Sequence, residues 1–123
     1  MERRDLEDRL IEFASSVLDA CKHIDGDYAI NHLKKQLIRS STSAALNYGE
    51  AQVGESTADF IHKLRISLKE LKESFICLRL LIRRPALSDL DLEQIKQENN
   101  ELIAIFIASI RTASGGFGRN NKK

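Results

Sequence analysis

Four stretches of this 123-residue chain repeat apolar side chains at intervals of three and four residues, and short polar segments separate them. That spacing places the apolar side chains on one face of an α-helix. The expected helices cover about residues 3–22, 28–53, 56–84 and 88–113. Connections of a few residues bring consecutive helices side by side in opposite directions. The pattern predicts an all-α, up-down-up-down antiparallel four-helix bundle over residues 1–114, followed by a flexible basic tail over 115–123.

Local signals mark the ends of these helices. Ser56, followed by Asp59, has the form of a capping box with Asp in place of the usual Glu or Gln. Pro85 ends the third helix, because the residue before a proline avoids the helical region. The polar residues from Ser88 to Asp91 are expected to cap the fourth helix.

The middle of the second helix, from Ser40 to Ser43, consists of poor helix formers. Packing must therefore hold this stretch helical. Its small side chains would also let another helix approach closely.

The composition excludes several classes of protein. With 42% hydrophobic and 30% charged residues, the chain is neither disordered nor a membrane protein. Its longest apolar run, residues 102–110, is half the length of a membrane span. The N-terminus has no apolar signal-peptide region, so we expect a cytoplasmic protein. Cys21 and Cys77 are expected to be free buried thiols, with a disulfide as the alternative.

No residue pattern indicates catalysis or a cofactor. The closest approach to a metal-binding motif is Asp59-x-x-His62, which stands alone at a helix start where Asp59 has a capping role. There is no nucleophile motif, and no glycine-rich loop precedes a helix. We therefore expect a protein that is not an enzyme, with no metal and no cofactor.

Two segments are apolar around the whole helix circumference, residues 75–82 apart from Arg79 and residues 102–108. A helix of a four-helix bundle buries one stripe, so a second buried face predicts a homo-oligomer. The alternative is that the surface tolerates a few surplus apolar residues. The expected interface residues are Ile76, Leu80, Ile103, Ile105 and Ile107.

The net charge is only +1, but basic and acidic side chains are unevenly distributed along the sequence. Residues 56–84 carry seven basic and three acidic side chains, and residues 28–53 carry three and one. Residues 1–22 have a net charge of −2, and residues 85–113 a net charge of −3. The basic side could attract a phosphate backbone, pair with the acidic side of a neighbouring subunit, or only be solvated. The candidate nucleic-acid contacts are Lys34, Lys35, Arg39, Lys63, Arg65, Lys69, Arg119, Lys122 and Lys123.

A set of polar residues is expected on the inner side of the second and third helices. It consists of Arg39, Asn47, Glu50, Arg65 and Glu73. One interpretation is a binding pocket. The other is a structural network of charges and hydrogen bonds that fixes the register of the two helices.

The same region carries a resemblance to a known family. It rests on segments 36–41, 43, 47–50, 59–60 and 64–73, among them Asn47-x-x-Glu50 and Leu64-Arg65-Ile66. In these segments the chain resembles the small bacterial proteins of the ribosomal-protein-S23-like group, which is encoded within intervening sequences of 23S ribosomal RNA genes. Ala45 stands where the family commonly has a proline, and residues 51–55 replace its usual glycine and basic residues.

The resemblance implies a four-helix bundle, a ring-like homopentamer and binding to RNA. One relative is the accessory protein of diversity-generating retroelements, a basic pentamer that engages nucleic acid and a reverse transcriptase. We therefore expect a non-enzymatic, homo-oligomeric bundle whose basic second and third helices bind structured RNA. The alternative is an adaptor that binds a protein partner through apolar helix faces. No membrane partner is expected.

Overall fold

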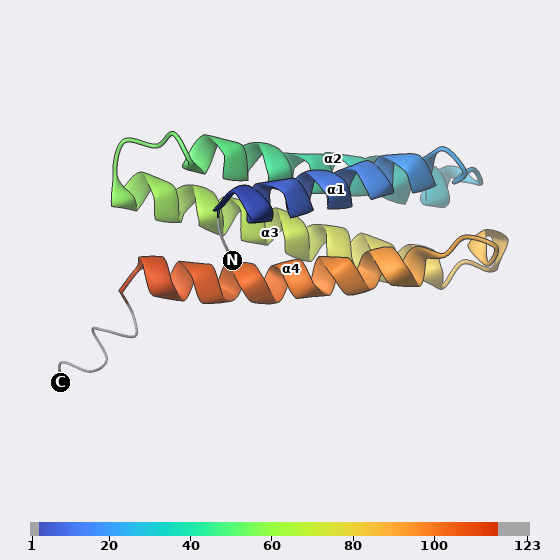
Figure 1. Ribbon diagram of the computed structural model, residues 1–123. Helices are drawn as coiled ribbons and strands as arrows, with labels where there is room; N and C mark the ends of the chain where they lie inside the picture. Colours follow the sequence, from blue (N-terminus) through green and yellow to red (C-terminus); the bar gives the residue numbers. More distant parts are fainter. Residues whose placement is uncertain (1–2, 116–123) are drawn as a thin grey trace.

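The computed structural model describes residues 3–115, which form an all-α structure with four long helices (Figure 1). They are α1 (Arg3–Cys21), α2 (Tyr28–Ala51), α3 (Thr57–Ile82) and α4 (Leu92–Ala113). A short 3-10 helix, η1 (Pro85–Leu87), lies between α3 and α4. The described residues contain no strand, and none of their helices is both long enough and apolar enough to cross a membrane.

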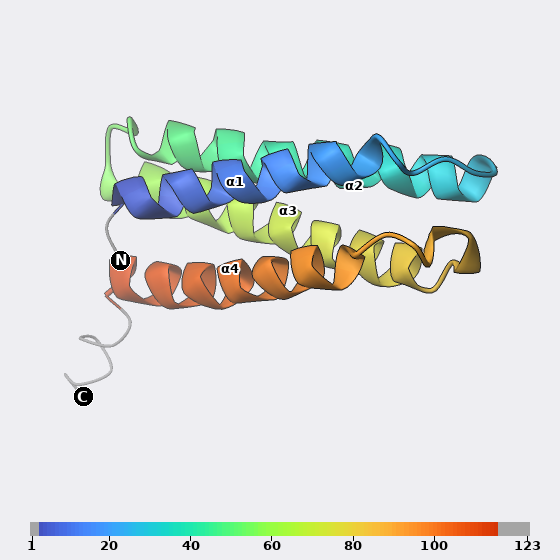
Figure 2. The same cartoon turned by 45° about the vertical axis from the view of Figure 1, so that its right-hand side comes forward.

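The helices lie side by side along their length (Figures 1 and 2). The α1–α2 and α3–α4 connections lie at one end of the molecule, and the α2–α3 connection lies at the other. Helix α2 packs against α1 and α3, and α4 packs against α3 and α1. The backbones of α1 and α3 do not approach each other closely, so these two helices occupy diagonal corners of the bundle.

Side-chain caps fix where three of the helices begin. Ser56 accepts a hydrogen bond from the backbone N–H of Asp59 at 3.1 Å, which confirms the predicted start of α3. Asp27 caps α2 in the same way, through the N–H of Ile30 at 3.0 Å.

The fourth helix begins later than the sequence pattern indicated. Asp91 is its N-cap, so α4 starts at Leu92 rather than at residue 88. The residues just before it belong to a tight turn, in which the N–H of Ser88 bonds to the carbonyl of Pro85 at 3.1 Å. Pro85 is the first residue of this 3-10 turn, and Ser88 closes it. The residue at which α4 was expected to start therefore belongs to the turn.

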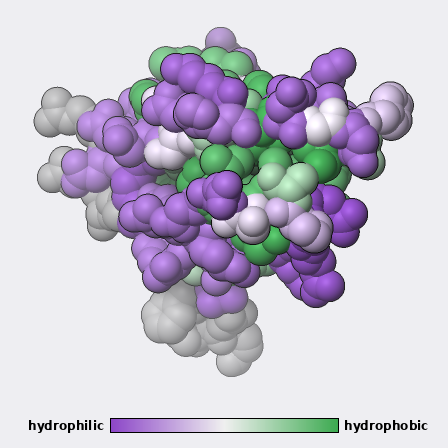
Figure 3. Space-filling view, turned by 90° about the vertical axis from the view of Figure 1, so that its right-hand side faces the viewer, coloured by the Kyte–Doolittle hydropathy of each residue, from purple (hydrophilic) through white to green (hydrophobic). Residues whose placement is uncertain are grey.

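The core lies between the four helices and follows the expected apolar stripes. Phe106 from α4 meets Tyr48 from α2 edge to face, with ring centroids 5.6 Å apart. Ile24 and Leu87 from the two connections are buried at one end of the bundle. Figure 3 shows this end, where apolar residues are surrounded by hydrophilic ones. The other fully buried large apolar side chains are Leu10, Phe13, Val17, Leu37, Leu64, Leu71, Leu78, Leu81 and Leu102.

The close approach predicted for the serine-rich stretch is confirmed at the contact between α2 and α3. The hydroxyl oxygens of Ser40 and Ser74 lie 2.8 Å apart, and both residues are fully buried. Ser67 donates its hydroxyl proton to the carbonyl of Ala44 on α2, at 2.9 Å. Small residues on both helices therefore let their backbones come together, and each buried hydroxyl is hydrogen-bonded.

Both cysteines are buried free thiols, as expected. Burial raises the pKa of the Cys21 thiol from 9.0 to about 11, and it raises the pKa of Cys77 as well. Thiols in such surroundings stay protonated and react slowly at neutral pH.

Candidate nucleic-acid interface

The outer face of α3 carries a row of exposed basic side chains. Their positions follow helical spacing, so they share one side of the helix. The row spans about 27 Å from its first to its last residue, at 1.5 Å per residue. We call it the α3 stripe; it consists of Arg65, Lys69, Lys72, Ile76, Arg79, Leu80 and Arg83, all of them exposed.

The cations of this stripe have no carboxylate partner in the described part of the chain. None of the ion pairs formed among residues 3–115 involves any of the five. Arg79 lies over the ring of Phe75, with the guanidinium carbon 5.9 Å from the ring centroid. The positive charge of the stripe is therefore available to an external anion.

The two halves of the stripe differ in chemistry. The half nearer the start of α3 holds Arg65, Lys69 and Lys72 and has no large apolar side chain. The half nearer its end interleaves Arg79 and Arg83 with apolar residues. Ile76 and Leu80 are 48% and 43% exposed, which is high for side chains of this kind.

Several of the candidate nucleic-acid contacts already form hydrogen bonds or ion pairs within the chain. The Lys34 ammonium donates to the carbonyl of Ile24 at 3.0 Å, and so ties the α1–α2 connection to α2. The Lys63 ammonium lies 2.6 Å from a carboxylate oxygen of Glu50 and links α3 to α2. Lys35 is exposed. Arg119, Lys122 and Lys123 lie outside the described residues.

Arg39 is the centre of an ion-pair cluster between α2 and α3. Its guanidinium lies 3.2 Å from a carboxylate oxygen of Glu70 and also pairs with Glu73. The hydrogen bonds that Arg39 donates to Glu73 and Glu70 raise the pKa of Arg39, so it stays charged. Glu70 is only 6% exposed, whereas the Arg39 side chain is 49% exposed. The pair therefore holds a buried carboxylate at the helix contact, with its cation at the surface.

The expected cluster of polar residues on the inner side of the two helices does not form as one unit. Arg39, Glu50 and Arg65 are exposed, which corrects that expectation. Asn47 donates to the carbonyl and hydroxyl oxygens of Ser43, within its own helix. Only Arg39 and Glu73, among the five residues expected there, are brought into direct contact.

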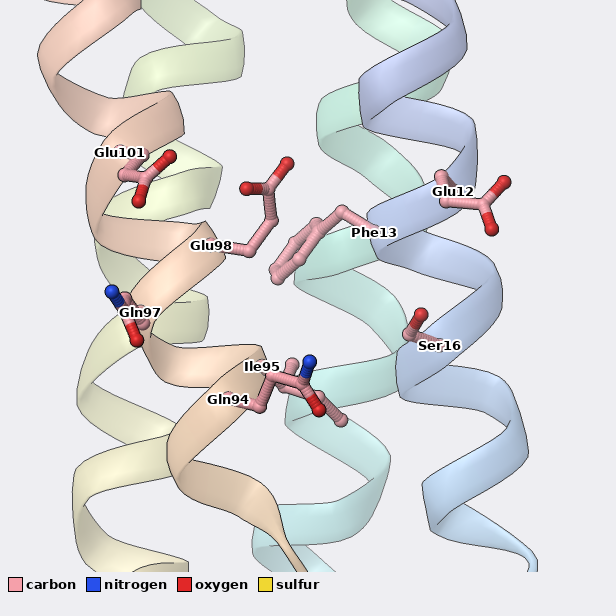
Figure 4. A pocket seen from close by; sticks show the side chains of 8 residues that line it. All are labelled: Glu12, Phe13, Ser16, Gln94, Ile95, Gln97, Glu98 and Glu101. Carbon is pink, nitrogen blue, oxygen red and sulfur yellow. The ribbon is translucent and has the colours of Figure 1, made fainter.

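A groove of about 490 Å³ separates α1 from α4 on another side of the bundle. Phe13 from α1 and Glu98 from α4 extend into the space between the helices (Figure 4). Glu12 lies on the α1 rim with its carboxylate turned outward, and Glu101 lies on the α4 rim. The remaining lining residues are Ser16, Gln94, Ile95 and Gln97.

Arg9 bridges α1 and α4 beside this groove. Its guanidinium lies 2.7 Å from Glu98 and 3.1 Å from Glu101, and the hydrogen bond to Glu98 raises the pKa of Arg9. Within the described residues, no group of three or more His, Cys, Asp or Glu side chains is arranged to hold a metal ion.

Comparison with known proteins assigns the chain to a family. The family model for the 23S rRNA-intervening sequence protein matches residues 5–108. The chain belongs to the 23S rRNA-intervening sequence protein family. No curated protein matches it.

One solved structure similar to this family member comes from Bacteroides thetaiotaomicron and is described as a protein of unknown function from the S23 ribosomal protein family. The TM-score is 0.77 at 33% sequence identity, and the match covers 90% of this chain and 99% of the other. Neither the description of the family nor that of this relative names an enzymatic activity.

Sequence reasoning had not selected Lys72, Arg79 and Arg83 of this 23S rRNA-intervening sequence family protein as contact residues. The signal that identifies them is helical spacing: Lys72 follows Lys69 by three residues, Arg79 follows Lys72 by seven, and Arg83 follows Arg79 by four. That spacing places them beside Lys69 on the outer face, where the structure puts them.

Proposed function

We propose that this protein is a non-enzymatic, homo-oligomeric, antiparallel four-helix bundle of the cytoplasm that binds structured RNA. The proposed contacts are Arg65, Lys69 and Lys72, the purely basic half of the α3 stripe. The observation that carries the proposal is that these three exposed cations lie on one helix face without a carboxylate partner in the described residues.

Unpaired cations in a row suit a phosphate backbone. Each Lys or Arg that neutralises a phosphate releases condensed counterions, which drives binding at low salt. A cation that is already paired with a carboxylate contributes less to the binding free energy, because the carboxylate must be displaced before the cation can contact a phosphate. For this reason Arg39 and Lys63, which are paired within the chain, are left out of the proposed contacts.

The residues of the α3 stripe favour recognition of the shape of a folded RNA over recognition of its bases. Recognition of single strands relies on aromatic side chains on which bases stack. The α3 stripe contains no aromatic residue. A rigid, nearly straight row of cations fits the regularly spaced phosphates of a folded RNA helix.

Self-association is the second element of the proposal. Ile76 and Leu80 on α3 and Ile107 on α4 remain 40–48% exposed. A second copy would remove these side chains from water, at about 25 cal/mol for each Å² buried. Ile103 and Ile105, the other expected interface residues, already pack partly against the core.

The adaptor function remains the second candidate, favoured by the outer face of α2. Tyr28 and Leu46 on α2, and Val53 just after its end, are 67–85% exposed. Such side chains suit an apolar contact with another protein, which would depend little on salt.

Fluorescence anisotropy with a labelled, structured ribosomal RNA fragment tests the proposed contacts. We compare the variant Arg65→Ala/Lys69→Ala/Lys72→Ala with a control, Lys22→Ala/Arg84→Ala/Arg111→Ala. The control removes the same charge from exposed positions outside the stripe. The stripe variant should lose at least about tenfold in affinity while the control stays within about threefold of wild type. Equal losses in both would reduce the effect to net charge and contradict the proposed site.

A further inference from the structure

The groove between α1 and α4 carries a net negative charge beside apolar groups. Three carboxylates line it, those of Glu12, Glu98 and Glu101, and Arg9 at its edge pairs with the last two. The net charge of this surface is therefore −2. Between the rims lie Ile95, which is partly buried, and Phe13, which is only 2% exposed and forms the floor of the groove.

The second half of the α3 stripe has the complementary composition. Arg79 and Arg83 give it a net charge of +2, and Ile76 and Leu80 provide apolar side chains between them. No carboxylate lies on this face of the helix, since the nearest ones, Glu70 and Glu73, turn toward Arg39.

The two surfaces also agree in length. The α4 side of the groove runs from Gln94 to Glu101, which is about 10 Å along the helix axis. The apolar and basic half-stripe runs from Ile76 to Arg83, which is again about 10 Å. The basic half-stripe can therefore lie along the groove with its cations beside the carboxylates of the rims.

The two surfaces cannot meet within one copy of the chain. Helices α1 and α3 stand at diagonal corners of the bundle and do not pack side by side. The outer face of α3 points away from the groove that α1 and α4 form. Any contact between the two surfaces must therefore join two copies.

We infer that the α1–α4 groove of one copy receives the Ile76–Arg83 face of α3 from a second copy. The contact is head to tail, because each copy contributes a different surface. Repeated contacts of this kind close into a ring when the rotation between copies allows it, and otherwise extend as a filament. The first half of the stripe, with Arg65, Lys69 and Lys72, stays outside the contact and available to RNA. The inference rests on the proposed self-association and names the surfaces that carry it.

Charge reversal on each side of the contact tests the inference. The groove variant is Glu12→Lys/Glu101→Lys, and the stripe variant is Arg79→Glu/Arg83→Glu. All four side chains are exposed, so the fold should tolerate the changes, which circular dichroism checks. The matched control is Asp25→Lys/Glu55→Lys, two exposed carboxylates in connections outside the groove.

Light scattering of the nuclease-treated proteins at micromolar concentration gives the mass. Wild type and control should have a mass several times the 13.9 kDa of one chain. The groove variant and the stripe variant should each fall to the mass of one chain. A chain that carries all four reversals restores opposite charges across the contact and should return to the wild-type mass.

Three results would overturn the inference, and each has a different meaning. A wild-type oligomer that survives both variants would refute this contact and leave self-association in place. A monomeric wild type would refute self-association itself. Loss of mass in both variants without recovery in the combined chain would also contradict direct pairing of the two surfaces.

Discussion

Arg9 on α1 donates two hydrogen bonds to the carboxylate of Glu98 on α4, at 3.0 and 2.7 Å. The two residues are 89 positions apart in the sequence and join helices at opposite ends of the chain. The groove opens beside this bridge, so the bridge helps to set the distance between its two walls. Bidentate pairing of this kind fixes geometry as well as supplying energy.

Replacing Arg9 tests the strength of this bridge. Both side chains are about one-third exposed, so solvent screens the pair, and Arg9→Met should lower the free energy of unfolding by about 1 kcal/mol. Urea denaturation measures the change. The matching variants are Glu98→Gln and the double variant, which together form a double-mutant cycle. A coupling energy near zero would show that the bridge does not hold the two helices together.

The close contact between α2 and α3 leads to a second prediction. Ser74 is fully buried with its hydroxyl against Ser40, so Ser74→Leu forces a larger side chain between two helices that already touch. Overpacking of this kind costs about 1–3 kcal/mol or more in unfolding free energy. Ser15→Leu is the control, since Ser15 is exposed on α1. Thermal or urea unfolding should separate the two variants, and equal stability would mean that the contact can widen freely.

The buried thiol of Cys21 predicts how stability depends on pH. Burial raises its pKa from 9.0 to about 11, so the folded protein keeps this proton at a pH where the unfolded chain has lost it. Unfolding therefore releases a proton between about pH 9 and pH 11, and rising pH favours the unfolded state in that range. Below pH 9 the thiol is protonated in both states, and its contribution is fully present.

Thermal unfolding of wild type and Cys21→Ala at pH 8, 9 and 10 measures this contribution. Other groups that titrate in this range are shared by both proteins, so the difference isolates Cys21. The wild-type midpoint should fall more steeply with pH than that of the variant. Parallel pH profiles would show that the thiol titrates alike in the folded and unfolded chains.

The sequence predicted the helices and their core because both depend on local spacing. Ser56 marks a helix start in the sequence, and its side chain caps α3 as expected. The start of α4 was harder to locate, because both Ser88 and Asp91 have the chemistry of a cap. Asp91 takes that role because Pro85 holds the preceding residues in a 3-10 turn.

The basic surface was harder to predict, because the partner of a charged side chain depends on how two helices are rotated against each other. Lys63 and Lys69 look alike in the sequence, yet Lys63 turns toward Glu50 on α2 while Lys69 faces outward. Lys34 likewise donates a hydrogen bond to a backbone carbonyl ten residues away. Spacing along one helix does find Lys72 and Arg79, but it does not reveal that they lack partners.

The α1–α4 groove had no signal in the sequence. It joins residues that are about eighty to ninety positions apart, such as Phe13 and Ile95, and both are apolar residues of ordinary helical stripes. Only the packing of α1 against α4 brings Glu12, Glu98 and Glu101 to one surface. The opposite net charges of these two helices and of α3 were nevertheless visible in the composition of each segment.

The measurement that tests the central claim most directly is the salt dependence of RNA binding by the wild-type protein. A labelled, structured ribosomal RNA fragment is titrated by fluorescence anisotropy at several salt concentrations from low to physiological. Three phosphate contacts predict that log affinity falls by about 2–3 units for each tenfold rise in salt, and more if several copies bind together. Absence of binding at low salt, or an affinity that salt does not change, would contradict a function carried by Arg65, Lys69 and Lys72.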